Sequence, residues 1–351
     1  MAAQDRPDPW RPQTVPLFGL SYSPGLGMLL GAGVVHTRYA FRALPPSTRL
    51  RAEAEYATAA ESYRAELAGE FRQPLAPSVL NVELLASELE LIRFYGFGNE
   101  TVSSGPDSSY EVRQRQFLFV PSVTVALDAR RRLTFGPLVK YAHTRRDTTT
   151  LLTRTGPYYG AHNFGALGVR AVLKSDTRDS PAAAAQGVYL RLTGQWHPAA
   201  WDAVRPFGSV SAEAATYLSL GEGIPPVATL ALRAGGAHAS GTVPFHEMIY
   251  IGGETTVRGY AEQRFAGRTG AYANAELRLL VGRPAIGDVG VFGLADAGRV
   301  WIAGESSDRW HAAAGGGLWF AWQHRRSNTV TIAAARSPER TAIYLRAGFM
   351  F

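Results

Sequence analysis

The sequence has no cysteine and only two lysines, Lys140 and Lys174. The absence of cysteine excludes disulfide frameworks, thiolate metal sites and thiol nucleophiles. The sequence also lacks any run of about 18 uninterrupted apolar residues, which excludes a membrane-spanning helix. If the chain crosses a membrane, it must do so as a closed β-barrel, because only helices and closed sheets pair every backbone group in lipid.

An apolar N-terminal leader is missing as well. Residues 1–10 are polar and rich in proline, so they contain no signal peptide. We expect residues 1–15 to form a disordered or trimmed N-terminal segment, or the chain to be the tail of a longer protein.

The net charge of +7 comes almost wholly from arginine. A basic chain often binds nucleic acid. Here, however, the arginines are spread at alternate positions along strand-like segments and do not cluster on one helix or in one run. We therefore expect no nucleic-acid partner, and we interpret many of these arginines as part of a polar barrel lumen.

Polar and apolar residues alternate from one end of the chain to the other. Residues 49–56 (RLRAEAEY) and 272–280 (YANAELRLL) are examples, and a period of two predicts strands with one polar and one apolar face. Several segments are longer than the roughly 5 to 6 residues of a soluble strand, as tilted membrane strands must be. We count about sixteen strands, an even number that suits a closed antiparallel barrel. The predicted strands span residues 16–23, 26–37, 47–57, 61–72, 78–90, 110–127, 131–146, 159–174, 186–197, 204–218, 226–238, 271–282, 287–301, 308–322, 328–336 and 341–351.

The connections between these strands alternate between short and long. The short turns include 128–130 and 282–287, and the long connections are 91–109, 147–158 and 239–270. Outer-membrane barrels have short periplasmic turns and longer extracellular loops. The sequence therefore predicts an all-β protein in which residues 16–351 form one transmembrane antiparallel β-barrel.

Three neighbouring segments carry a resemblance to a known family. They are residues 251–260 (IGGETTVRGY), the strand 272–280, and residues 294–298 (LADAG). Together they resemble the bacterial surface antigen superfamily, which includes the BamA/TamA-type outer-membrane assembly factors and the two-partner-secretion translocators. The resemblance implies a long extracellular loop that folds into the lumen, with Arg258 at its tip.

The resemblance also implies partners for that arginine. Asp296 is the first candidate, because the family places the acid of a Phe-x-Asp-x-Gly strand against the arginine, although here Leu294 replaces the aromatic residue. Glu276 has lumen parity and is a second candidate, but it is equally well placed to pair with its strand neighbour Arg278. The remaining candidate residues of the loop tip are Tyr260 and three glycines that permit a tight backbone, Gly252, Gly253 and Gly259.

Three further strings are similar to elements of the same superfamily. Residues 344–351 (YLRAGFMF) resemble the sorting signal of outer-membrane barrels, with Tyr344, Phe349 and Phe351 as its candidate residues. Residues 94–101 (FYGFGNET) resemble the start of a loop, and residues 176–181 (DTRDSP) resemble a periplasmic turn. We assign none of them a catalytic role.

Enzyme signatures are missing from the sequence. It contains no G-x-S-x-G, H-E-x-x-H or G-x-x-x-x-G-K motif, and its histidines are scattered. His246-Glu247 lacks the second histidine of a metal-binding helix, and a catalytic rim site built from His143 and Asp147 is not favoured. We expect no catalytic residue, no bound metal and no cofactor.

The resemblance implies a bacterial outer-membrane location and a role in inserting or translocating polypeptides. Its expected partners are the lipid bilayer, client outer-membrane or secreted polypeptides, and periplasmic domains in a longer form of the chain. A client strand would add at a weak seam between the first and last strands. The alternative is a non-catalytic outer-membrane anchor or pore module for a fused or separate partner domain, and a plain diffusion porin is a third candidate.

Overall fold

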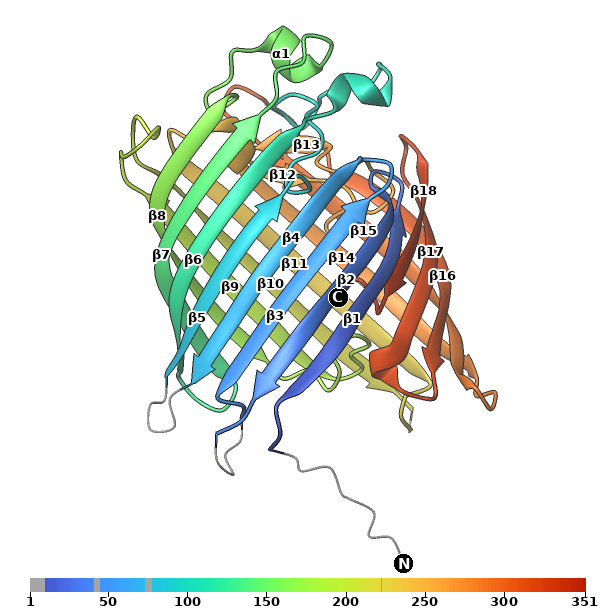
Figure 1. Ribbon diagram of the computed structural model, residues 1–351. Coiled ribbons are helices and arrows are strands. Elements are labelled where there is room, and N and C mark those ends of the chain that lie inside the picture. The colour runs from blue at the N-terminus through green and yellow to red at the C-terminus, as the bar shows by residue number, and fades with distance from the viewer. Residues whose placement is uncertain (1–9, 41–44, 73–77, 222) are drawn as a thin grey trace, which may run out of the picture.

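The computed structural model describes residues 10–40, 45–72, 78–221 and 223–351. Within these ranges, sixteen antiparallel strands close into one barrel in which each strand pairs with its neighbours along the chain (Figure 1). The last strand, β18, pairs with the first, β1, and β11 pairs with β14 because β12 and β13 form a separate two-stranded sheet. The predicted barrel of about sixteen strands is confirmed.

The strands of the barrel are mostly 10 to 15 residues long, and only the last two are shorter. The first eight are β1 (Gln13–Ser23), β2 (Gly27–Arg38), β3 (Thr48–Ala57), β4 (Ser62–Arg72), β5 (Ser78–Ser87), β6 (Gln114–Ala126), β7 (Arg131–Thr144) and β8 (Asn163–Asp176). The other eight are β9 (Gly187–His197), β10 (Phe207–Leu220), β11 (Ala228–Gly241), β14 (Thr269–Gly282), β15 (Gly287–Trp301), β16 (His311–Trp322), β17 (Thr329–Arg336) and β18 (Thr341–Ala347). The connections contain β12 (Ile249–Ile251), β13 (Phe265–Gly267), α1 (Leu151–Thr155), η1 (Asp107–Tyr110), η2 (Phe245–Glu247) and η3 (Arg326–Asn328).

The two faces of each strand have different chemistry. On β10, Val210 and Leu218 are 47% and 52% exposed on the outside, whereas Tyr217 is buried on the inside. The same alternation leaves large apolar side chains exposed around the barrel, including Phe18, Leu190 and Ile332. Such an outer surface suits lipid, and the inner surface carries most of the charged residues.

The two mouths of the barrel differ in the length of their connections. One mouth has the turns 127–130 and 283–286. The other has the long connections 88–113, 145–162 and 242–268, and Figure 1 shows α1, β12 and β13 near that mouth. Since long loops face outward in such barrels, we call it the extracellular mouth. Among the described residues, no helix is both long enough and apolar enough to cross a membrane.

The structure differs from the predicted strands at two places. The strand expected at 341–351 ends at Ala347, because Gly348 adopts φ +81° and turns the chain away from the wall. The short strands β12 and β13 were not predicted, since three apolar residues in a loop carry no periodic signal. Of the N-terminal segment expected at 1–15, residues 1–9 lie outside the described residues, and Gln13 already begins β1.

Candidate functional site

The candidate site lies where the loop 242–268 meets the inner face of β14 and β15. Gly252, Gly253 and Gly259 have φ values of +116°, +88° and +84°, which other residues rarely adopt. A side chain would also clash at Gly253, because a Cβ atom there would lie 2.1 Å from the carboxylate of Glu262. Glycine is therefore required for the fold of this loop tip, which we define as residues 252–260.

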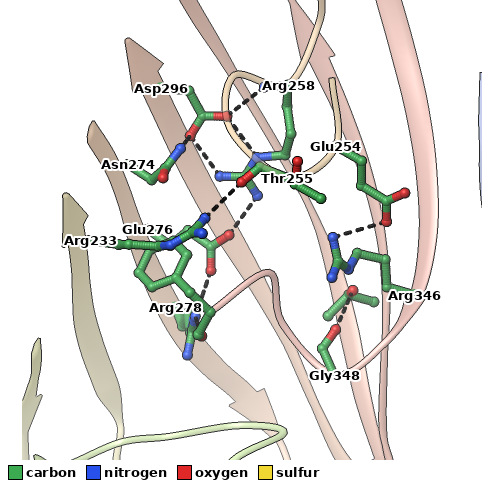
Figure 2. A network of polar contacts seen from close by, with 12 residues as sticks. Arg233, Glu254, Thr255, Arg258, Asn274, Glu276, Arg278, Asp296, Arg346 and Gly348 are labelled. Atoms are coloured by element: carbon green, nitrogen blue, oxygen red, sulfur yellow. Dashed lines mark hydrogen bonds and ion pairs between the residues drawn. The ribbon is translucent and has the colours of Figure 1, made fainter. Parts of the chain in front are cut away.

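Arg258, at the end of this tip, is only 3% exposed and binds two carboxylates of the wall (Figure 2). Its Nε and Nη2 atoms each donate to a different oxygen of Asp296 at 2.8 Å, and its backbone N–H donates to Asp296 at 3.0 Å. Its Nη1 atom donates to Glu276 at 2.6 Å. Burial alone lowers the pKa of Arg258, but these two acids outweigh burial and raise the pKa above its ordinary value.

Both interpretations of Glu276 apply at once. One carboxylate oxygen accepts from Arg258, and the other accepts from Arg278 at 2.7 and 3.0 Å. Asn274 adds a neutral link, since its amide donates to Asp296 at 2.9 Å and to the Thr256 carbonyl at 2.7 Å. The network thus combines two guanidinium groups with two carboxylates, so the formal charges balance. Paired and hydrogen-bonded charges of this kind are tolerated in a buried position, although Asn274 Oδ1 has no hydrogen-bond partner among the described residues.

The loop tip also contacts the last two strands. The Gly259 N–H donates to the Tyr344 hydroxyl of β18 at 2.9 Å, and Ser337 donates its hydroxyl to the Gly259 carbonyl at 2.7 Å. Glu254 forms an ion pair of 2.9 Å with Arg346 on β18. The tip is therefore bonded to the β17–β18 turn and to the inner face of β18.

The residues that follow the tip contact the other side of the barrel. Gln263 accepts from the backbone N–H groups of Ile92 and Arg93 at 3.1 and 3.2 Å. A Cβ atom on Gly25, in the turn between β1 and β2, would lie 3.0 Å from the side chain of Glu262. Burial raises the pKa of Glu262 to about 7. The loop thus touches elements on both sides of the junction between β1 and β18.

That junction, the seam between β1 and β18, is poorly paired. Tyr22 and Leu345 are the only residue pair in register across it among the described residues, whereas β1 and β2 are in register over eleven pairs from Gln13↔Thr37 to Ser23↔Gly27. Since β18 ends at Ala347, residues 13–19 of β1 extend past it. No strand among the described residues pairs with this edge of β1, and an unpaired edge is the usual template for adding another strand.

The model of the Omp85 superfamily domain matches residues 48–324, which is well over half of the chain. The chain belongs to the Omp85 superfamily. It is an integral outer-membrane β-barrel of this protein assembly and translocation superfamily. A comparison with curated protein sequences found no match.

Solved Omp85-like structures share the fold. BamA from Haemophilus ducreyi lacking POTRA domains 1-3 superposes with a TM-score of 0.70 at 14% identity, covering 97% of this chain and 71% of that chain. CdiB from Acinetobacter baumannii gives 0.56 at 14% identity, with 96% and 60% covered. CdiB from Escherichia coli gives 0.61 at 13% identity, with 96% and 63% covered. The chain therefore spans less than two thirds of the CdiB structures, and at these identities the likeness shows the fold alone.

The end of this Omp85 barrel departs from the sequence interpretation. Phe349 and Phe351 were expected within the predicted strand 341–351, but the chain turns at Gly348 and both residues lie against the inside of the barrel. The Phe349 N–H donates to the Ala182 carbonyl of the β8–β9 turn at 2.9 Å, and the Arg278 guanidinium lies 3.8 Å from the centroid of the Phe349 ring. Arg278 also donates to the Phe351 carbonyl at 2.9 Å. Their role in sorting stays a prediction, as does that of Tyr344, which faces inward to bond Gly259.

Several contacts in the Omp85 barrel were not anticipated from sequence. Asn99, inside the string 94–101, donates its amide to the Arg309 carbonyl at 2.9 Å and accepts from the Val300 N–H at 3.0 Å. The ring centroid of Phe94 lies 5.1 Å from the ring centroids of both Phe97 and Tyr158. The aromatic and glycine content of this string was the available signal, whereas its partners lie far away in sequence. These contacts hold the extracellular loops together.

The arrangement considered as a catalytic rim site is not assembled. His143 shares a hydrogen bond of 2.6 Å with Asn163, and one carboxylate oxygen of Asp147 accepts from the backbone and hydroxyl of Thr149. In the described part of the chain, no cluster of three or more acidic or histidine residues is arranged to hold a metal.

Proposed function

We propose that this barrel inserts or translocates client polypeptides at the outer membrane through its β1–β18 seam. The role is non-catalytic: the client adds its own strand to a free edge, and no covalent bond changes. The observation that carries the proposal is the single register pair Tyr22↔Leu345, beside a β1 edge that is free over residues 13–19. Backbone hydrogen bonds to such an edge supply affinity for an extended peptide with little dependence on its sequence.

The loop is proposed to act as a brace inside the lumen. Its tip is anchored to β14 and β15 by Arg258, and it bonds β18 through Gly259 and Glu254. A brace of this kind would keep β18 in place while the edge of β1 is free to separate from it. β1 would then be the strand that moves at the seam. Residues 262–263 of the loop contact the turn after β1 at Gly25 and the connection after β5 at Ile92.

A disulfide across the seam tests this proposal. Tyr22→Cys with Leu345→Cys places two thiols on directly opposed residues, and opposed Cα atoms of about 4.5 to 5.5 Å lie within disulfide range. The native chain has no cysteine, so no other disulfide can form. Ala32→Cys with Ala54→Cys is the matched control, because these residues are opposed within the continuous β2–β3 pairing.

The readout is insertion of a urea-denatured small outer-membrane barrel into liposomes that contain the reconstituted protein. We expect oxidation of the seam pair to abolish insertion, reduction to restore it, and oxidation of the control pair to have no effect. Full activity of the oxidised seam pair would overturn the proposal. Absence of activity in all reduced forms would instead favour the anchor or pore module.

A further inference from the structure

A second surface stands out on the outer face of β6 and β7, at the extracellular mouth. Moving outward along these strands, the opposed pairs are Phe117 with Tyr141 and then Arg115 with His143. The ladder ends one pair later, and beyond it the Arg145 N–H donates to the Arg113 carbonyl at 2.9 Å. Two successive outward-facing pairs are thus made entirely of basic residues.

The aromatic pair beneath them marks the edge of the hydrocarbon region. Phe117 is 43% exposed. The ring centroid of Tyr141 lies 6.4 Å from that of Phe117, and the Trp201 ring stacks on Tyr141 with 5.9 Å between the centroids. Aromatic residues exposed in this way occupy the membrane–water interface. At about 3.3 Å per residue, Arg113 lies about 13 Å along the strand from Phe117. The outermost basic pair is therefore at the height of the lipid headgroups.

Like charges that face each other across two strands destabilise their pairing. Neither Arg113 nor Arg145 has a side-chain hydrogen bond or ion pair with any residue that the structure describes. Two acids lie nearby. Glu88 accepts from Arg115 at 2.8 and 3.0 Å. Asp147 accepts from the hydroxyl and backbone N–H of Thr149, which lower its pKa, and the charges of Arg145 and Arg113 lower it further. Arg113 and Arg145 thus share one nearby carboxylate, Asp147, without a direct ion pair, and the pair keeps a net positive charge.

Other guanidinium groups at this mouth do have protein partners. Arg64 pairs with Glu90, Arg93 with Asp107, and Arg309 with Glu100. The opposed pair Arg113 and Arg145 differs from these three arginines, since neither of its members forms a direct ion pair with a described residue. A phosphate group suits this pair, because guanidinium groups bind phosphate oxygens through two parallel hydrogen bonds.

We propose that the phosphate of an outer-leaflet lipid headgroup binds between Arg113 and Arg145. Arg115, paired with Glu88, and His143 lie one row deeper, and the acyl chains lie against Phe117 and the apolar surface below it. This site is separate from the seam and does not depend on the proposed function. It fixes the depth and orientation of the β6–β7 wall in the outer leaflet.

The test measures retention of lipid A by native mass spectrometry of the detergent-purified barrel. The variant R113Q/R145Q removes two charges at the site, and R130Q/R132Q removes two charges at the periplasmic end of the same strand pair. We expect R113Q/R145Q to bind bisphosphorylated lipid A about tenfold more weakly or worse, whereas R130Q/R132Q binds like the native protein. Lipid A without phosphates should bind the native protein as weakly as it binds the variant.

Two results would overturn the proposal. The first is that the two double variants lose lipid A binding equally, or that neither loses it. The second is that an equal concentration of inorganic phosphate displaces lipid A completely, which would mean a site for free anions. Folding is checked by the heat-dependent shift in electrophoretic mobility. If R113Q/R145Q does not fold, the comparison of lipid A with and without phosphates on the native protein decides, and equal binding of the two would refute the site.

Discussion

Arginine–carboxylate ion pairs occur in two regions of this barrel, and they differ in how far water reaches them. On β3 and β4 the pairs Arg51–Glu53 and Arg64–Glu66 face the lumen, and their arginine side chains are 48% and 39% exposed. In the network between the loop tip and β14, the side chains of Arg258 and Arg278 are each 4% exposed and those of their acids are fully buried. Water can replace a lost partner in the first region but not in the second. The comparison teaches that burial, more than the identity of the ion pair, decides which arginine holds a loop in place.

Loss of the Arg258 side chain should have the largest effect. Arg258→Ala leaves Asp296 buried without its bidentate partner, and breaking a buried pair from one side costs about 3 to 5 kcal/mol. Arg51→Ala removes a solvated pair and should cost less than about 1 kcal/mol. Urea unfolding of both variants in detergent micelles measures the difference. Equal destabilisation would show that the network at the tip is not dry in solution.

The turn at Gly348 should respond next. Gly348→Ala introduces a side chain at φ +81°, and its Cβ would lie 2.8 Å from the Ala182 carbonyl. A left-handed conformation costs a residue other than glycine roughly 1 to 2 kcal/mol. Gly194→Ala is the control, because nothing lies within 4 Å of a Cβ there. Faster hydrogen exchange at the Phe349 amide in Gly348→Ala alone is the expected result, and unchanged exchange would contradict the inward docking.

The smallest effect should be a pH dependence of loop docking. Burial raises the pKa of Glu262 from its ordinary value of 4.5 to about 7, so the docked loop favours the neutral carboxyl group. This contribution is complete below pH 4.5 and is lost as the pH rises through about 7. The hydrogen bond from the Glu254 N–H to Glu262 lowers this pKa, the charge of Glu254 raises it, and the charges of Arg340 and Arg93 lower it.

Hydrogen exchange of residues 252–264 at pH 5.5 and 8.5 measures that dependence. Exchange should be slower at pH 5.5 in the native protein and nearly independent of pH in Glu262→Gln, after correction for intrinsic rates. Glu53→Gln, a change in the solvated region, should leave the dependence intact. A pH dependence that persists in Glu262→Gln would assign it to another group.

The strands were predictable because alternation is a local property, and a barrel needs it on every strand. The contact between Arg258 and Asp296 was anticipated only through a family resemblance, since 38 residues separate the two in sequence. The end of the chain was not predictable: the alternation of letters continues through Phe351, while the backbone leaves the wall at Gly348. What redirects it is a set of non-local partners, Arg278 and the β8–β9 turn, that no local pattern encodes.

The most direct test of the seam is to find where a client touches the barrel. A photo-crosslinking residue at Leu20 on β1 and one at Leu190 on β9 compare two outward sites of similar exposure, 52% and 47%. During insertion of a urea-denatured small outer-membrane barrel, the seam mechanism predicts client adducts at Leu20 and few or none at Leu190. Equal adducts at the two positions, or adducts at Leu190 alone, would contradict it.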